Sequence, residues 1–250
     1  MAAPAQDEFF GGGAGGVSTS TQNYTLVTAR TNELMVLTIA YEQANSTANS
    51  VTSVTDSTGL TWRKHSSINF TATADSNGLT GPSYSAIDVW WAYGNFPSTG
   101  GSFTINFASA VDHFAVSALW YGGANSVQPF DQHSSLSGTS DFIGSTAGAP
   151  SLSLSTQTKD VQLVGYVMTP SNNTITAGTF NSGAADYNHG AAFSTGGSFW
   201  CKMTDSGKAS TSGFSNEAVA FSSNTNVLMG AFAITADAQP TSKTFGTMMG

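Results

Sequence analysis

The sequence predicts an all-β protein, in which antiparallel strands form a sandwich or a barrel. Many short stretches are rich in β-forming residues or alternate between apolar and polar residues, and turn signals separate them. No window of about 11–18 residues carries the apolar stripe of an amphipathic helix. The strong helix formers Glu, Lys and Leu are also scarce. A hydrophobic fraction of 40% supplies enough material for a core.

Strands in the first half of the chain are predicted from two kinds of pattern. Residues 33–41 and 114–121 are almost entirely apolar, which is typical of central strands. The other predicted strands, which alternate or are rich in β-forming residues, are residues 51–55, 60–68, 87–93 and 102–107. Between the predicted strands at residues 51–55 and 60–68, Asp56 suits the opening of a turn, and Gly59 suits the turn position that requires positive φ.

Alternation also predicts which side chains share a face of the sheet. In residues 60–68, Trp62 and Ile68 are expected on one face and His65 on the other. In residues 87–93, Trp90 and Trp91 are expected on opposite faces, so that one of these two rings points outward.

The second half of the chain repeats the same style. Strands are predicted at residues 151–154, 161–168, 191–203, 217–221 and 227–235. Residues 125–150 and 170–189 are polar and rich in glycine, and are predicted to be long loops. Because the strand pattern is unbroken, one β-domain is expected over residues 19–237.

Both ends of the chain differ from the part between them. Residues 1–18 are predicted to be a flexible arm, because Phe9 and Phe10 precede a glycine-rich stretch that cannot build a core. Residues 238–250 are predicted to be a tail of similar character. The side chains expected to dock on a partner are Phe9, Phe10, Phe245, Met248 and Met249.

Composition argues against several classes of function. Only 9% of the residues are charged and the net charge is −8, so nucleic-acid binding is not expected. No apolar run approaches the roughly 18 residues of a membrane-spanning segment. Cys201 is the single cysteine, and its neighbours are typical of a small buried residue. The opening residues carry neither the basic region nor the apolar run of an export signal.

No motif in the sequence predicts catalysis, a metal site or a cofactor. The four histidines do not lie at zinc-binding spacings, and the carboxylates are spread thinly along the chain. The glycine-rich stretch has neither the Lys nor the following Ser or Thr of a phosphate-binding loop. We therefore expect no catalytic residue, no metal ligand and no cofactor, and we expect that the protein is not an enzyme.

Several segments together resemble a β-sandwich module found in structural proteins of tailed bacteriophages. The segments that carry this resemblance are VTSVTDSTGLTW, DVWWAY, SFTINFASA, ALWYGGAN, the Pro129-Phe130-Asp131 segment, KDVQLVGY and the closing VLMGAFAIT. Their order and spacing match over residues 33–168, and the closing segment matches the last strand of the module. The resemblance implies a single antiparallel β-sandwich of jelly-roll type, and it implies a scaffold rather than a catalytic fold.

The resemblance leads to an expectation of function. A virion protein is folded in the host cytoplasm and later exposed on the particle, which fits an acidic, weakly charged surface without an export signal. We expect a capsid decoration protein on the particle exterior. Its expected partners are the major capsid protein and copies of itself. If the copies form a closed ring, a trimer is the first to test. The alternatives are a phage tail or fibre component, or a carbohydrate-binding module in which Trp90 or Trp91 contacts a glycan.

Overall fold

A computed structural model provides the structure of this chain. It describes residues 5–25, 29–43, 45, 47–72, 83–97, 101–131, 140–143, 151–155, 161–169, 179–180, 183–184, 187–192, 200–209, 216–220 and 227–237. All regular structure in these ranges is β-strand, which confirms the prediction of an all-β protein. The strands are β1 (Ala5–Thr25), β2 (Arg30–Gln43), β3 (Val51–Asp56), β4 (Arg63–Ala72), β5 (Ser83–Phe96), β6 (Ser102–Gly122), β7 (Ser140–Ile143), β8 (Ser151–Ser155), β9 (Gln162–Thr169), β10 (Thr179–Phe180), β11 (Gly183–Ala184), β12 (Tyr187–Ala192), β13 (Trp200–Ala209), β14 (Asn216–Ala220) and β15 (Val227–Ile234).

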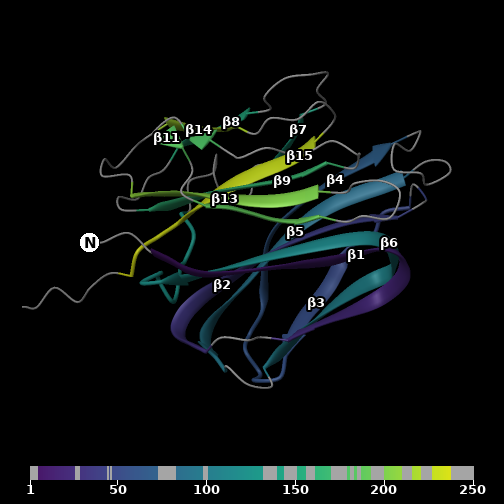
Figure 1. The fold of residues 1–250 in the computed structure, drawn as a ribbon, viewed down its shortest axis with the longest axis horizontal. Coiled ribbons are helices and arrows are strands. Elements are labelled where there is room, and N and C mark those ends of the chain that lie inside the picture. Colours follow the sequence, from purple (N-terminus) through teal and green to yellow (C-terminus); the bar gives the residue numbers. More distant parts are fainter. Residues whose placement is uncertain are drawn as a thin grey trace, which may run out of the picture.

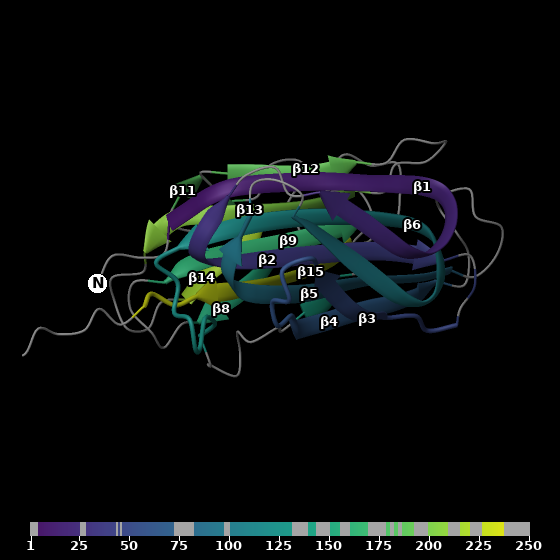
Figure 2. The same ribbon diagram turned by 90° about the horizontal axis from the view of Figure 1, so that it is seen from below.

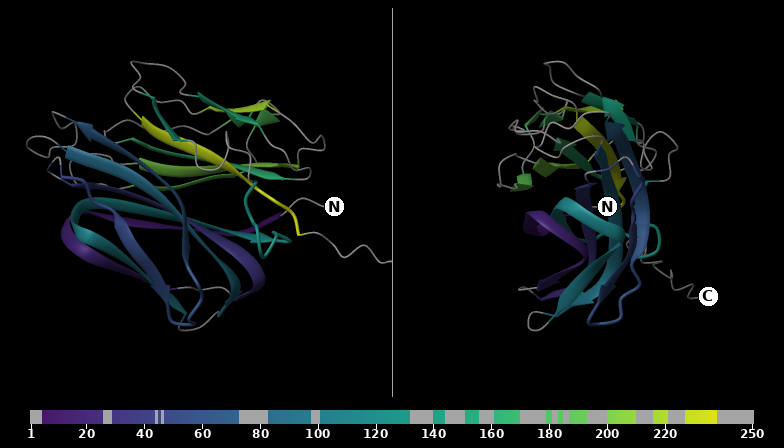
Figure 3. Two further views of the ribbon diagram at one scale, coloured as in Figure 1. Left: turned by 180° about the vertical axis from the view of Figure 1, so that it is seen from behind. Right: turned by 90° about the vertical axis from the view of Figure 1, so that its right-hand side faces the viewer.

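The strands form antiparallel sheets, of which the largest is the central sheet. Its strand order is β1-β6-β2-β5-β4, and β3 also pairs with β6. A second sheet has the order β12-β13-β9-β15-β7, and a third has the order β11-β10-β14-β8. Figure 1 shows β9, β13 and β15 on one side of the central strands, and β3 on the other. Figure 3 shows the same arrangement from behind.

The middle of the central sheet is buried on both faces. Residues 33–43 of β2, 83–92 of β5 and 113–121 of β6 are buried at every position. Strands that are covered on both faces need apolar side chains at consecutive positions rather than at alternate ones. This explains why residues 33–41 and 114–121 are apolar runs, and it confirms both as central strands.

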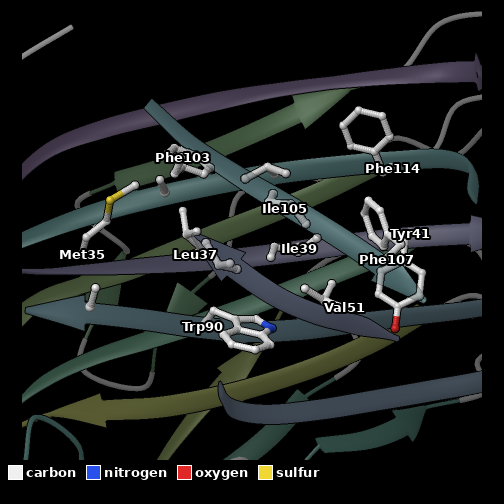
Figure 4. Packing of buried hydrophobic residues seen from close by; sticks show 14 of the residues in the cluster. Met35, Leu37, Ile39, Tyr41, Val51, Trp90, Phe103, Ile105, Phe107 and Phe114 are labelled. Atoms are coloured by element: carbon white, nitrogen blue, oxygen red, sulfur yellow. The ribbon is translucent and has the colours of Figure 1, made fainter. Parts of the chain in front are cut away.

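A bend in β6 creates one of the two core clusters. The first half of β6 pairs with β3 and the second half with β2, and residues 108–110 between them are exposed. The two halves therefore place their side chains on opposite walls of one cluster, with Phe103 and Ile105 on one wall and Phe114 and Trp120 on the other. Figure 4 shows this packing around Met35, Leu37 and Ile39 of β2. The runs 102–107 and 114–121, which are predicted as separate strands, are one bent strand.

The second core cluster fills the space between the central and second sheets. It joins Leu34, Val36 and Ala40 of β2 to Val164, Tyr166 and Met168 of β9 and to Leu228, Phe232 and Ile234 of β15. Tyr166 lies across β15 at Gly230, where an added Cβ would come within 2.2 Å of the tyrosine ring. Glycine is therefore required for this close approach. The first and second halves of the chain share this cluster.

Phe130 brings part of a predicted loop into the same cluster. Its ring centroid lies 5.7 Å from that of Trp91 and 5.4 Å from that of Phe232. Phe130 also forms a β-bridge with Ile234, and the Thr235 N–H donates to the Pro129 carbonyl oxygen at 2.8 Å. The predicted loop over residues 125–150 is therefore interrupted by the bridge at Phe130 and by β7. The loop predicted at residues 170–189 likewise contains β10 and β11 and the start of β12.

Most other predicted strands are confirmed, with two corrections. The predictions at residues 51–55, 151–154, 161–168, 217–221 and 227–235 correspond to β3, β8, β9, β14 and β15, with each end within one residue of the strand; residue 221 lies outside the described residues. Residues 191–203 are not one strand, because Ala192 of β12 pairs with Trp200 of β13 in an antiparallel ladder. The faces of β4 also differ from the prediction. A register shift between Lys64 and Ser66 places His65 against the cluster that contains Ile68, while Trp62 packs on the other cluster.

Asp56 forms the turn between β3 and β4 through its carboxylate. Its Oδ1 accepts hydrogen bonds from the Thr58 N–H at 2.7 Å and from the Thr58 hydroxyl, and Gly59 has φ 79°. Its Oδ2 accepts the Trp62 Nε1–H at 2.7 Å, which fixes the indole beside Phe103. Burial alone would raise the pKa of Asp56, but the donated hydrogen bonds hold it below its ordinary value. The predicted turn is confirmed.

Asp88 is a buried carboxylate that ties four strands together. It lies on β5 with no exposed surface, and its Oδ2 accepts the Val51 N–H of β3 at 3.0 Å. Lys64 Nζ of β4 lies 3.0 Å from the same oxygen, and the Ser67 hydroxyl of β4 donates to Oδ1. The Tyr41 hydroxyl of β2 is 3.5 Å away, and burial together with this carboxylate raises the pKa of Tyr41. A buried carboxylate needs partners of this kind to offset its loss of hydration.

Replacement of Asp88 should therefore be costly. Asp88→Ala is expected to lower the free energy of unfolding by about 3 kcal/mol, because it leaves buried donors without their acceptor. Ser67→Ala removes one donor to the same carboxylate and should cost only about 1 kcal/mol. Urea denaturation of both variants measures the difference, and equal small losses would contradict the role given to Asp88.

The turn at Asp56 allows a test with a pH signature. Asp56→Ala should lower the free energy of unfolding at neutral pH by about 1–2 kcal/mol, because the turn and the indole lose their acceptor. The stabilisation is present above the ordinary pKa of 3.8 and is lost as the pH falls below it and the carboxylate protonates. The gap between parent and variant should therefore close in acid. Thr58→Val, which keeps the carboxylate, is the control and should show a smaller loss.

Candidate functional site

The candidate site is the edge of the central sheet that β1 closes. β2 and β3 together occupy one edge of β6, and β1 pairs with its other edge. In the described part of the chain, β1 pairs with no strand other than β6. Figure 2 shows β1 running along β6, with β12 close beside it. An edge of this kind is where a further strand can be added to a sheet by main-chain hydrogen bonds.

The second half of β1 is held by side chains as well as by the backbone. The Tyr24 ring stacks on Phe103 with a centroid distance of 5.1 Å and an interplanar angle of 20°. The Thr104 hydroxyl donates to Asn23 Oδ1 at 2.6 Å. These contacts attach residues 19–25 firmly to the first half of β6.

The first half of β1 is paired over a glycine-rich sequence. Residues 5–15 pair with residues 113–122 of β6, and Gly11, Gly12 and Gly13 lie opposite Ser117, Val116 and Ala115. Glycine has no side chain to pack, and it weakens the interior of a strand. The main-chain ladder therefore provides the attachment at these positions.

Two buried hydroxyls lie in register with Gly11. Ser117 pairs with Gly11 on one side and with Thr38 of β2 on the other. The side chains of Thr38 and Ser117 have no exposed surface, and neither hydroxyl oxygen has a hydrogen-bond partner in the described part of the chain. An unpaired buried hydroxyl costs about 1–3 kcal/mol, so this part of the sheet carries a local energetic cost.

The predicted docking residues fall partly on this edge. Phe9 lies opposite Leu119 and Phe10 opposite Ala118 in the β1–β6 ladder, although their side chains lie outside the described residues. The prediction of a flexible arm over residues 1–18 is therefore wrong for residues 5–18, which belong to β1. The tail at residues 238–250, with Phe245, Met248 and Met249, lies outside the described residues.

Trp90 and Trp91 lie on opposite faces of β5, as predicted, but neither points outward. Trp90 is 8% exposed and packs in the cluster of Figure 4, and Trp91 is 9% exposed and packs in the other cluster. The Arg63 guanidinium lies 5.2 Å from the centroid of the Trp91 ring. The expectation that one of these rings is outward is wrong, because both faces of β5 are covered. Their contact with a glycan stays a prediction.

A second buried carboxylate lies at one end of the central sheet. Glu42 of β2 has no exposed surface and pairs in register with His113 of β6 and Ser85 of β5. His113 Nδ1 lies 3.8 Å from Glu42 Oε2, and the Ser85 hydroxyl donates to Oε1 at 3.3 Å. Sequence reasoning did not single out Asp88 or Glu42. A carboxylate inside an otherwise apolar run is the signal that a buried partner exists.

His65 is the other titratable group with a clear structural position. Its ring centroid lies 4.1 Å from that of Phe130 and 5.5 Å from that of Phe232, and its Nδ1 lies 3.2 Å from the Ser66 hydroxyl oxygen. Burial lowers the pKa of His65 from 6.5 to about 4. The imidazole is therefore neutral at physiological pH and serves as an aromatic packing partner.

Other chemically capable groups do not gather in the described part of the chain. No group of three or more His, Cys, Asp or Glu residues with metal-binding geometry occurs among the described residues. No described helix is long and apolar enough to cross a membrane. Cys201 lies in β13 opposite Met168 of β9, and its side chain lies outside the described residues.

Comparison with known proteins gives no relative. No family model, curated protein or solved structure matches this chain.

The position of His65 predicts a specific loss of stability in acid. Between pH 6.5 and about 4 the unfolded chain binds a proton that the folded imidazole does not, so the free energy of unfolding falls as the pH falls. His65→Phe should remove this part of the pH dependence, on the order of 2 kcal/mol after allowing for partial exposure of the ring. Urea denaturation across this pH range tests the prediction. Parallel curves for the parent and variant would contradict it.

Proposed function

We propose that this chain is a structural virion protein of a tailed bacteriophage, a capsid decoration protein that binds the outer shell and stabilises it. The observation that carries the proposal is the position of the segments that resemble the phage module. Asp56 and Trp62 build a turn, Trp91 and Phe130 fill the core, and β9 and β15 supply the facing sheet. The resemblance therefore lies in the residues that build the framework, as expected for a scaffold protein.

We propose further that the packed sheets are a β-sandwich of jelly-roll type. The central and second sheets enclose one continuous cluster between them, and both are antiparallel. Such a framework is suited to a mechanical role. A rigid protein that binds across neighbouring shell subunits adds buried surface between them, and it stabilises the folded shell by mass action.

The surface chemistry agrees with an exposed position on a particle. A net charge of −8 with few charged residues keeps the protein soluble and does not attract phosphate backbones. The proposed partners are the major capsid protein and other copies of the chain.

Copy number tests the proposal directly. Quantitative mass spectrometry of purified particles should find the chain at a number comparable with that of the major shell protein. Particles assembled without the chain should release their DNA at a lower temperature, and purified chain added back should restore the parent value. A few copies per particle, or none, would contradict decoration and would direct attention to the tail or fibre.

A further inference from the structure

We propose that the first half of β1, residues 5–15, is exchanged between copies of this protein. In the exchanged form these residues pair with residues 113–122 of β6 in a second copy, in the register that they adopt within one chain. This inference rests on the proposed function, because a capsid shell is where many copies of the chain would lie close together.

The first argument is that β1 can leave without dismantling the sheet. The order β6-β2-β5-β4 and the pairing of β3 with β6 do not involve β1. Withdrawal of residues 5–15 therefore opens one edge of β6 and leaves every other described ladder of the central sheet in place. The opened edge presents a row of main-chain donors and acceptors that a matching strand must cover.

The second argument is a hinge at the middle of β1. Gly15 pairs with His113 and Thr19 with Val111, so three residues of β1 face a single residue of β6. A second register shift follows between Thr19 and Thr21. Gly16 lies inside this irregular stretch, and glycine adopts new backbone angles at little steric cost. The Tyr24 and Asn23 contacts hold the residues after the hinge, so movement is confined to the residues before it.

The third argument is that the closed edge is weakest in the part that would move. The glycines at residues 11–13 contribute no side chain, and the hydroxyl of Ser117, which pairs with Gly11, is buried without a hydrogen-bond partner among the described residues. Main-chain hydrogen bonds do not depend on which copy supplies the strand. A second copy therefore offers the same ladder as the chain's own strand.

Geometry and local concentration favour a second copy as the partner. Eleven extended residues span about 36 Å at roughly 3.3 Å per residue, which matches the length of residues 113–122 of β6 that they would cover in an adjacent copy. The β1–β6 contacts are the same within one chain and between two chains. The ratio of exchanged to unexchanged protein therefore depends on the effective concentration of the neighbouring copy. A shell or a concentrated solution raises that concentration.

A disulfide pair distinguishes the two arrangements in the full chain. Ala5 pairs with Gly122 at the start of β1, so A5C/G122C, in a chain that also carries Cys201→Ser, can form a disulfide in either arrangement. The protein is unfolded, refolded at low or high concentration and oxidised, and the products are separated on a non-reducing gel. At high concentration the monomer band should be lost in favour of covalent dimers or larger closed rings.

The matched control lies after the hinge. Thr25 pairs with Ser102, so T25C/S102C in the same background should give covalent monomers at every concentration. Monomers from both pairs at high concentration would overturn the proposal. Intermolecular products from both pairs would overturn the position of the hinge and the proposal of a partial exchange.

A measurement on the unaltered chain covers the case in which A5C/G122C does not fold. Protein refolded at high concentration should elute as an oligomer that persists after dilution, because separation requires withdrawal of a strand. A monomer at every concentration would overturn the exchange. Both measurements use purified protein and test only the exchange. The proposed decoration role is tested separately, by the copy number in particles.

Discussion

The structure depends on the hydrogen bonding of one long strand, β6. Its first half pairs with β3, its second half pairs with β2, and its opposite edge pairs with β1. The bend at residues 108–110 turns the two halves toward each other, so that a single strand supplies two walls of a core cluster. Strand order, the position of the cluster and the location of the edge that β1 closes all follow from this one strand.

Burial on both faces is the second constraint, and it explains the polar residues inside the sheet. A charged or hydroxyl group at these positions has no access to water, so it must find partners on neighbouring strands. Asp88 does so with donors from three strands, and Glu42 lies in register with His113 and Ser85. Among the described residues, Thr38 and Ser117 have no such partners. Ser117 pairs with Gly11 of β1, and Thr38 lies on the other side of β6.

These features describe a rigid framework with one weakly held edge. The framework supports the proposed mechanical role, and the edge supports the proposed exchange between copies. Gly11, Gly12 and Gly13 weaken β1, and the register shift between Gly15 and Thr19 follows them. Under the proposed exchange, the residues that stabilise the fold and the residues that join copies lie in different parts of the molecule.

Local chemistry in the sequence was sufficient to predict the strands and one turn. Apolar runs identified the central strands, alternation identified the opposite faces of β5, and Asp56 with Gly59 identified the turn, because these patterns depend only on nearby residues. The tertiary structure decided the rest. Gly-rich β1 is a strand only because β6, distant in sequence, supplies its ladder. Trp90 and Trp91 are both buried because two separate layers cover β5, and His65 changes face because of a bulge in β4. Such features arise from pairing and packing between distant segments, which no local pattern encodes.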